Sequence, residues 1–126
     1  MQDGKHVVLC IDDDADVRFA LRTVLEANGY MVADAASAEE GLKVYKKANP
    51  DVIILDLMME EVDAGASFVK DLQAQGNAAP IYMLSSVGDN LNLATDYTSL
   101  GLAGVFQKPI DHKRLLSILA TKLGTA

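Results

Sequence analysis

Short apolar runs alternate with amphipathic helical patterns from one end of the chain to the other. The runs cover residues 6–11, 30–35, 52–55, 81–84 and 105–107. Such alternation with short connections predicts a mainly parallel sheet with helices on both faces. The run at 52–55 is apolar at every position, as expected of a strand buried on both faces at the centre of the sheet. We therefore expect an α/β fold of the (βα)5 type.

The expected helices carry their own boundary signals. Asn28-Gly29 is a typical stop for the first helix, and Ser37 with Glu40 forms a capping box that begins the second. Asp111 can cap the last helix, while residues 90–100 predict a weaker one. This succession fits a doubly wound sheet of five strands in the order 2-1-3-4-5.

Composition limits the size and the partners of the protein. A chain of 126 residues, half of them hydrophobic, predicts one domain over residues 1–126. The net charge of −7 opposes binding to nucleic acid or anionic lipid. The sequence has neither an apolar stretch of the roughly 20 residues that a membrane span needs nor a secretory leader, so we expect a cytoplasmic protein. Cys10, the single cysteine, lies in an apolar run and is expected in the core.

Residues that can bind metal or phosphate follow four of the five runs. Asp12 and Asp13 follow the first run and Asp56 the third, whereas Ser85 follows the fourth and Lys108 the fifth. In the order 2-1-3-4-5 the sheet has its switch point between the first and third strands, and ligands bind beyond the carboxyl ends of the strands there. We expect the three carboxylates to share one crevice, with the hydroxyl and the amine beside it.

This set of side chains predicts reversible phosphorylation. Three carboxylates in one crevice repel one another, and Mg²⁺ would relieve that repulsion. Asp56, after the most apolar run, could act as a nucleophile, because carboxylates form acyl phosphates. Lys108 would pair with phosphoryl oxygens, and Ser85 could donate a hydrogen bond to one of them. Asp14 is expected to be only a helix cap.

Over essentially its whole length the chain resembles a response-regulator receiver domain of the single-domain chemotaxis type, which implies a flavodoxin-like fold. The matching residues are Asp12-Asp13, Asp56, Ser85 and Lys108-Pro109. The resemblance implies that Asp56 accepts phosphate from a phosphohistidine on a sensor histidine kinase or a histidine phosphotransfer protein. It also implies that Asp12, Asp13, Asp56 and the backbone carbonyl of Met58 hold Mg²⁺.

The resemblance also assigns a signalling role to the later strand ends. Ser85 would be the switch hydroxyl and Lys108 the phosphate-pairing amine, in a Lys108-Pro109 step that is often cis in the family. Where many receivers carry a switching Tyr or Phe, this chain has Val105. The ring of Phe106 should point to the other face of the sheet. We therefore expect an altered relay to a downstream protein whose identity the sequence does not specify.

Two departures from the family pattern lie near the acceptor. Glu60 replaces the proline that receivers commonly carry four residues after it, so the following loop is more acidic. Met58 and Val87 stand at positions that modulate phosphate lifetime in the family, and neither can orient an attacking water. We expect slow self-dephosphorylation of Asp56, and no turnover of a separate substrate.

Other functions fit the residues less well. A phosphatase of the haloacid-dehalogenase type needs Thr or Val where this chain has Asp16, and three aspartates would repel the phosphate of a flavin. The main alternative is a non-phosphorylated, receiver-like interaction module. Such modules usually lack the acceptor, a metal carboxylate or the lysine, and this chain keeps them all. Both a stand-alone regulator and a domain of a longer protein fit the sequence.

Overall fold

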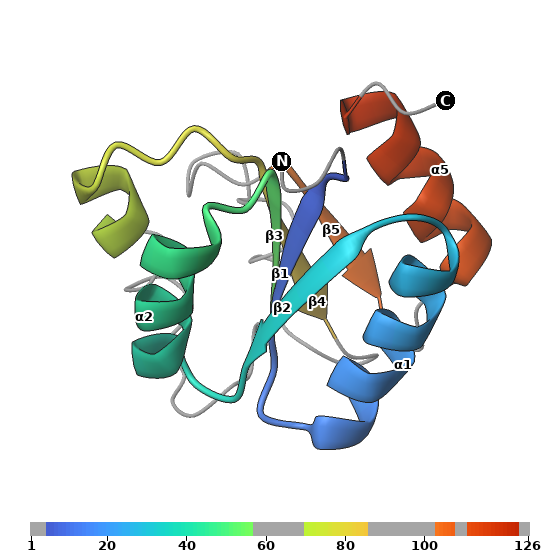
Figure 1. The fold of residues 1–126 in the computed structure, drawn as a ribbon, viewed down its shortest axis with the longest axis horizontal. Helices are drawn as coiled ribbons and strands as arrows, with labels where there is room; N and C mark the ends of the chain where they lie inside the picture. The colour runs from blue at the N-terminus through green and yellow to red at the C-terminus, as the bar shows by residue number, and fades with distance from the viewer. Residues whose placement is uncertain (1–4, 57–69, 86–102, 108–110, 124–126) are drawn as a thin grey trace.

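Five parallel strands form one sheet in the order β2-β1-β3-β4-β5 (Figure 1). The computed structural model describes residues 5–56, 70–85, 103–107 and 111–123. The strands are β1 (Val7–Ile11), β2 (Met31–Ala35), β3 (Val52–Asp56), β4 (Ile81–Ser85) and β5 (Gly104–Gln107). Both the parallel sheet and the strand order agree with the sequence prediction.

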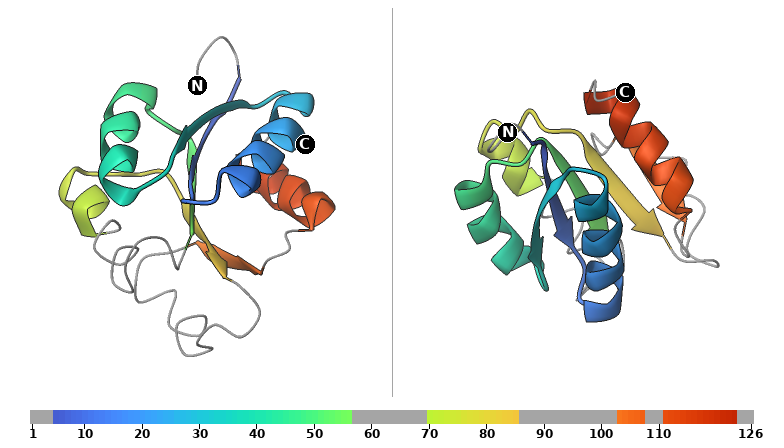
Figure 2. Two further views of the ribbon diagram at one scale, coloured as in Figure 1. Left: turned by 90° about the horizontal axis from the view of Figure 1, so that it is seen from below. Right: turned by 45° about the vertical axis from the view of Figure 1, so that its right-hand side comes forward.

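Helices cover both faces of this sheet (Figures 1 and 2). On one face lie α1 (Ala15–Ala27) and α5 (His112–Leu123). On the other face lie α2 (Ala38–Ala48) and a helical segment at residues 70–74. The helix predicted at residues 90–100 lies outside the described residues.

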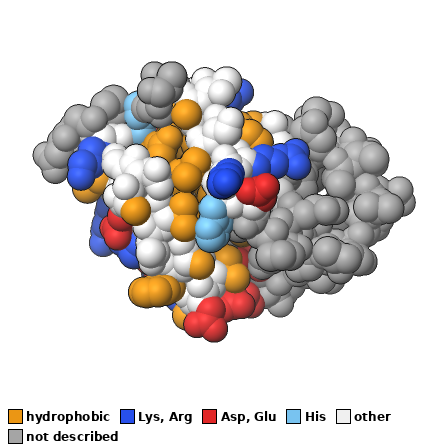
Figure 3. All heavy atoms as spheres, turned by 90° about the vertical axis from the view of Figure 1, so that its right-hand side faces the viewer, with side chains coloured by type: hydrophobic (Ala, Val, Ile, Leu, Met, Phe, Trp, Pro, Cys, Tyr) orange, Lys and Arg blue, Asp and Glu red, His pale blue; other side chains and the backbone are white. Residues whose placement is uncertain are grey.

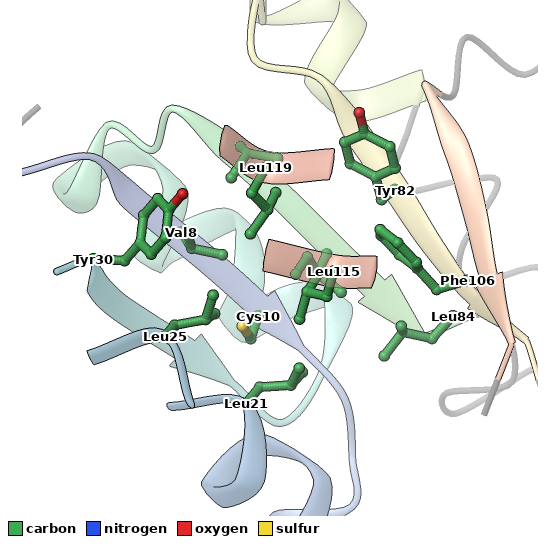
Figure 4. Close-up of a cluster of buried hydrophobic side chains, with 12 residues drawn as sticks. Val8, Cys10, Leu21, Leu25, Tyr30, Tyr82, Leu84, Phe106, Leu115 and Leu119 are labelled. Atoms are coloured by element: carbon green, nitrogen blue, oxygen red, sulfur yellow. The ribbon is translucent and has the colours of Figure 1, made fainter. Parts of the chain in front are cut away.

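The sheet separates two hydrophobic cores, because successive side chains of a strand point to opposite faces. The core beneath α1 and α5 includes Val8, Cys10, Leu21, Leu25, Leu115 and Leu119 (Figure 4). The core on the opposite face includes Leu9, Ile11, Ile53, Leu55 and Leu72. Every residue of β1 and β3 is buried, which confirms the central position predicted for the run at 52–55. The core position predicted for Cys10 is confirmed as well.

The helices begin and end at the signals found in the sequence. Ser37 Oγ accepts a hydrogen bond from the Glu40 backbone N–H at 3.1 Å, and α2 begins there. Gly29, just after α1, has a φ of 88°, in the left-handed region that glycine enters without steric cost. Asp111 Oδ1 accepts hydrogen bonds from two backbone N–H groups of α5, at 3.0 and 3.3 Å. The predicted caps are therefore confirmed.

Figure 3 shows the side of the molecule that carries α1 and α5. Hydrophobic side chains form a band on this side, and Lys and Arg are scattered among Asp and Glu. The described residues of this face thus form no continuous basic patch of the kind that binds nucleic acid. Within the described segments, no helix has the length and apolar character needed to cross a membrane.

Candidate functional site

Three carboxylates meet at the carboxyl ends of β1 and β3. Asp12 and Asp13 directly follow β1, and Asp56 is the last residue of β3. Because β1 and β3 pair in parallel with Ile11 opposite Leu55, the next residue of each strand reaches the same edge of the sheet. One carboxylate oxygen from each aspartate lies within 4.8 Å of the other two. The structure thus brings together the carboxylates that the sequence placed in one crevice.

The cluster combines two buried acids with an exposed one. Asp12 is 1% exposed and Asp56 is 5% exposed, whereas Asp13 is open to solvent. Negative charges this close repel one another, and burial strengthens the repulsion by lowering the local dielectric constant. Carboxylate oxygens are the donors that Mg²⁺ prefers in proteins. The donor set therefore fits the Mg²⁺ predicted from the sequence.

Hydrogen bonds fix the backbone and the carboxylate of Asp12. Its N–H donates to the carbonyl of Ala35 at the end of β2, at 3.1 Å. Its Oδ1 accepts a hydrogen bond from the Asp14 N–H at 2.8 Å. The guanidinium of Arg18, on α1, donates to its carbonyl oxygen. Arg18 was not among the residues predicted for the site, although a basic residue at the fourth position of a helix that follows an acidic loop is a usable signal.

Asp14 begins α1 and is not part of the cluster. Its Oδ1 accepts a hydrogen bond from the Asp16 N–H at 2.9 Å, and the side chain is exposed. A carboxylate at this position also interacts favourably with the positive end of the helix dipole. The predicted division of the three consecutive aspartates, with two at the crevice and one as a helix cap, agrees with this geometry.

Cys10 lies two residues before the cluster but offers no reactive group to it. Burial is the main reason that the pKa of its thiol rises to about 12, and the charge of Asp34 acts in the same direction. The nucleophilic form of cysteine is the thiolate. At neutral pH the Cys10 thiol is therefore protonated and unreactive.

The other predicted site residues are placed in part. Ser85 ends β4, and the preceding residue, Leu84, pairs with Asp56, so the backbone of Ser85 reaches the edge that carries the carboxylates. Phe106 packs beneath α1 and α5, with its ring centroid 5.3 Å from that of Tyr82 (Figure 4). The expectations for Met58, Glu60, Val87, Lys108 and Pro109 lie outside the described residues and stay predictions.

Known proteins similar to this chain share one kind of domain. The family model for the response regulator receiver domain matches residues 8–120. The "Probable transcriptional regulator ycf27" of Porphyridium aerugineum is 36% identical over 111 residues, which cover 88% of this chain and 45% of that protein. Chemotaxis protein CheY of Bacillus subtilis (strain 168) is 29% identical over 115 residues, which cover 90% of this chain and 94% of CheY. The chain spans less than half the length of the first curated relatives that it matches.

Solved structures give the same result. Chemotaxis protein CheY4 of Vibrio cholerae superposes with a TM-score of 0.81 at 32% sequence identity, over 94% of this chain and 98% of that one. The receiver domain of the Francisella response regulator 1452 superposes with a TM-score of 0.82 at 27% identity, over 94% of this chain and 96% of that one. The similarity therefore extends over nearly the whole chain in both cases.

Proposed function

The chain belongs to the response regulator receiver domain family, and from this we propose that it is a phosphorylation switch in a two-component system. Asp56 accepts a phosphoryl group from a phosphohistidine on a sensor histidine kinase or a histidine phosphotransfer protein. The observation that carries the proposal is the grouping of Asp56 with Asp12 and Asp13. A buried carboxylate at the end of a central strand is held in place, as an acceptor must be.

Magnesium is the proposed cofactor. Asp12, Asp13 and Asp56 would hold the ion, together with the backbone carbonyl of Met58 that the family resemblance adds. When bound, Mg²⁺ would offset the repulsion between the carboxylates and the incoming phosphoryl oxygens. The chain itself holds one of these oxygen donors firmly, because Asp12 is hydrogen-bonded through both its backbone and its side chain.

The transfer forms one bond and breaks one. An oxygen of the Asp56 carboxylate bonds to phosphorus, and the bond from phosphorus to the histidine nitrogen breaks with its electron pair left on the imidazole, which takes up a proton. Lys108 would pair with the phosphoryl oxygens, and Ser85 would donate a hydrogen bond to one of them. Hydrolysis restores the carboxylate, so the protein catalyses only its own modification.

Phosphorylation would change a surface that a downstream partner reads. Val105 stands where the family usually carries an aromatic switch, so the signal would leave the site by another route. Phe19, which is 70% exposed on α1, offers an apolar contact to a protein partner. The partner could be a separate protein or a further domain of a longer chain.

Intact mass after incubation with acetyl phosphate and Mg²⁺ tests the proposal. We expect the parent protein to gain one phosphoryl group and Asp56→Asn to gain none. Asp14→Asn is the matched control, because this neighbouring aspartate caps α1 and Asn caps a helix as well as Asp does. If the folded parent binds Mg²⁺ but gains no phosphoryl group, the non-phosphorylated interaction module is the better account.

A further inference from the structure

The side chain of Arg18 connects α1 to the loop that carries the metal-binding aspartates. Arg18 is the fourth residue of the helix, and its guanidinium donates a hydrogen bond to the Asp12 carbonyl, six residues earlier in the chain. Its own backbone N–H donates to the Asp14 carbonyl at 3.2 Å. The residue is half-buried, so this contact is partly shielded from water. Arg18 thus holds both ends of the segment 12–14.

We propose that Arg18 is a positioning residue for the cation site, an inference that rests on the proposed function. The Asp12 carbonyl belongs to the peptide group that joins Asp12 to Asp13. A guanidinium bound to that oxygen restricts rotation of the peptide plane, and the plane sets the direction in which Asp13 leaves the backbone. Arg18 would therefore keep the exposed Asp13 directed towards the two buried carboxylates before a cation arrives.

The bonds around Asp12 show why this contact matters. Its N–H donates to the Ala35 carbonyl at 3.1 Å, and its Oδ1 accepts a hydrogen bond from the Asp14 N–H at 2.8 Å. The bond from Arg18 is the one that reaches its carbonyl from α1. Without it the peptide group that leads to Asp13 would lose its side-chain partner, and the bond from the Asp14 N–H to Asp12 Oδ1 would be held less firmly. The expected loss is therefore in the geometry of the donor set more than in folding.

Charge alone would have the opposite effect on the metal. A guanidinium beside the site attracts the carboxylates but repels Mg²⁺, so its removal should tighten cation binding if charge were its whole role. Lysine keeps the charge but has a compact ammonium on a flexible stem in place of the planar, fixed donors of arginine. Arg18→Lys therefore tests the hydrogen bond at constant net charge, and Arg18→Gln tests the sign of the charge effect.

Arg22 provides a matched control on the same helix. It lies one turn further along α1, and it pairs with Glu26 at 3.2 Å and with Asp34 at 3.3 Å instead of the 12–14 segment. Arg22→Lys changes the same functional group by the same chemistry. Any effect common to the two variants reports on the helix and not on the cation site.

Two measurements on the full chain test the inference. In calorimetric titrations with Mg²⁺, Arg18→Lys should raise the Kd roughly tenfold, as loss of residues that orient metal ligands typically does. Arg18→Gln should also raise the Kd, and Arg22→Lys should change it by less than about twofold. In the metal-free protein, amide hydrogen exchange at Asp14 should be faster in both Arg18 variants than in the parent and in Arg22→Lys.

The outcomes separate the inference from the proposed function. An unchanged Kd and unchanged Asp14 exchange in Arg18→Lys would overturn the positioning role, as would tighter binding in Arg18→Gln. If the parent itself fails to bind Mg²⁺, the proposed cation site is wrong, and Asp14 exchange alone still reports whether Arg18 orders the loop. Thermal unfolding of each variant checks that the fold is intact.

Discussion

At the scale of single residues, β1 places two ionisable side chains in opposite environments. Cys10 points into the core beneath α1 and α5, whereas Asp12, just beyond the end of the strand, joins a cluster of carboxylates. Neither environment can be read from residue type alone. The strand position decides it, because an apolar neighbourhood keeps the thiol neutral while the sheet edge gathers charges that a cation can share.

Cys10 should make the protein less stable at high pH. Its pKa is about 12 in the folded protein against 9.0 in an unfolded chain, so above pH 9 unfolding releases a proton. The free energy of unfolding should be unaffected by this group below pH 9 and should fall as the pH rises from 9 towards 12. For one proton the free energy of unfolding can fall by at most about 1.4 kcal/mol per pH unit. Burial raises the pKa of Tyr82 too, which acts in the same direction.

Urea unfolding of the parent and of Cys10→Ala between about pH 8 and pH 10 checks this prediction, since these values lie about one unit either side of the onset. The slope of stability against pH above pH 9 should be shallower in the variant, which lacks the thiol but retains the contribution of Tyr82. The prediction is wrong if stability falls with pH equally steeply in the two proteins, because the thiol would then ionise to the same extent in the folded and the unfolded chain.

At the scale of secondary structure elements, β4 and β5 fit together through a glycine. Gly104 is paired with Tyr82 in the sheet, and a Cβ at position 104 would lie 3.0 Å from Cε1 of the tyrosine ring. That ring is buried against Phe106 and has little room to move. Gly104→Ala should therefore destabilise the protein by about 1–3 kcal/mol, the usual cost of overpacking.

A double-mutant cycle in urea identifies the cause of that loss. Tyr82→Leu removes the ring that the new methyl group meets, so the cost of Gly104→Ala should be smaller in the Tyr82→Leu background. The same cost in both backgrounds would attribute it to the backbone of β5 and not to the ring.

Signals that act over a few residues were enough to predict most of the elements. The apolar run at 52–55 was enough to predict a central strand, and Ser37 and Asp111 were enough to predict where helices begin, because these signals act over one to four residues. Strand order then placed Asp12 and Asp56 together. The contact of Arg18 with the Asp12 carbonyl was not predicted, because it depends on a side-chain conformation that spans a loop and a helix.

For the whole molecule, Mg²⁺ should act as a stabilising ligand. An ion that binds only the folded chain, at ten times its Kd, adds about 1.4 kcal/mol to the free energy of unfolding. For a domain of this size the Tm should rise by roughly 5 °C. Asp13→Asn should lose most of this rise, since Asp13 contributes an oxygen to the cluster, whereas Asp14→Asn should keep it.

Calorimetric scans with and without MgCl₂ check this, with NaCl used to match the ionic strength. Matching is essential, because a chain with a net charge of −7 is stabilised by any salt that screens its self-repulsion. An equal rise in NaCl, or a full rise in Asp13→Asn, would show that Mg²⁺ acts by screening and not by binding the cluster.

The alternation of side chains along β1 has an evolutionary consequence. Val8 and Cys10 fill one core and Leu9 and Ile11 fill the other, and the strand then delivers Asp12 to the edge. A lineage that gained or lost one codon here would exchange the occupants of the two cores and turn the aspartate away from the crevice. Apolar residues can replace one another within β1 at modest cost, but the number of residues in the strand cannot change. Selection should therefore act more strongly on the length of this strand than on its composition.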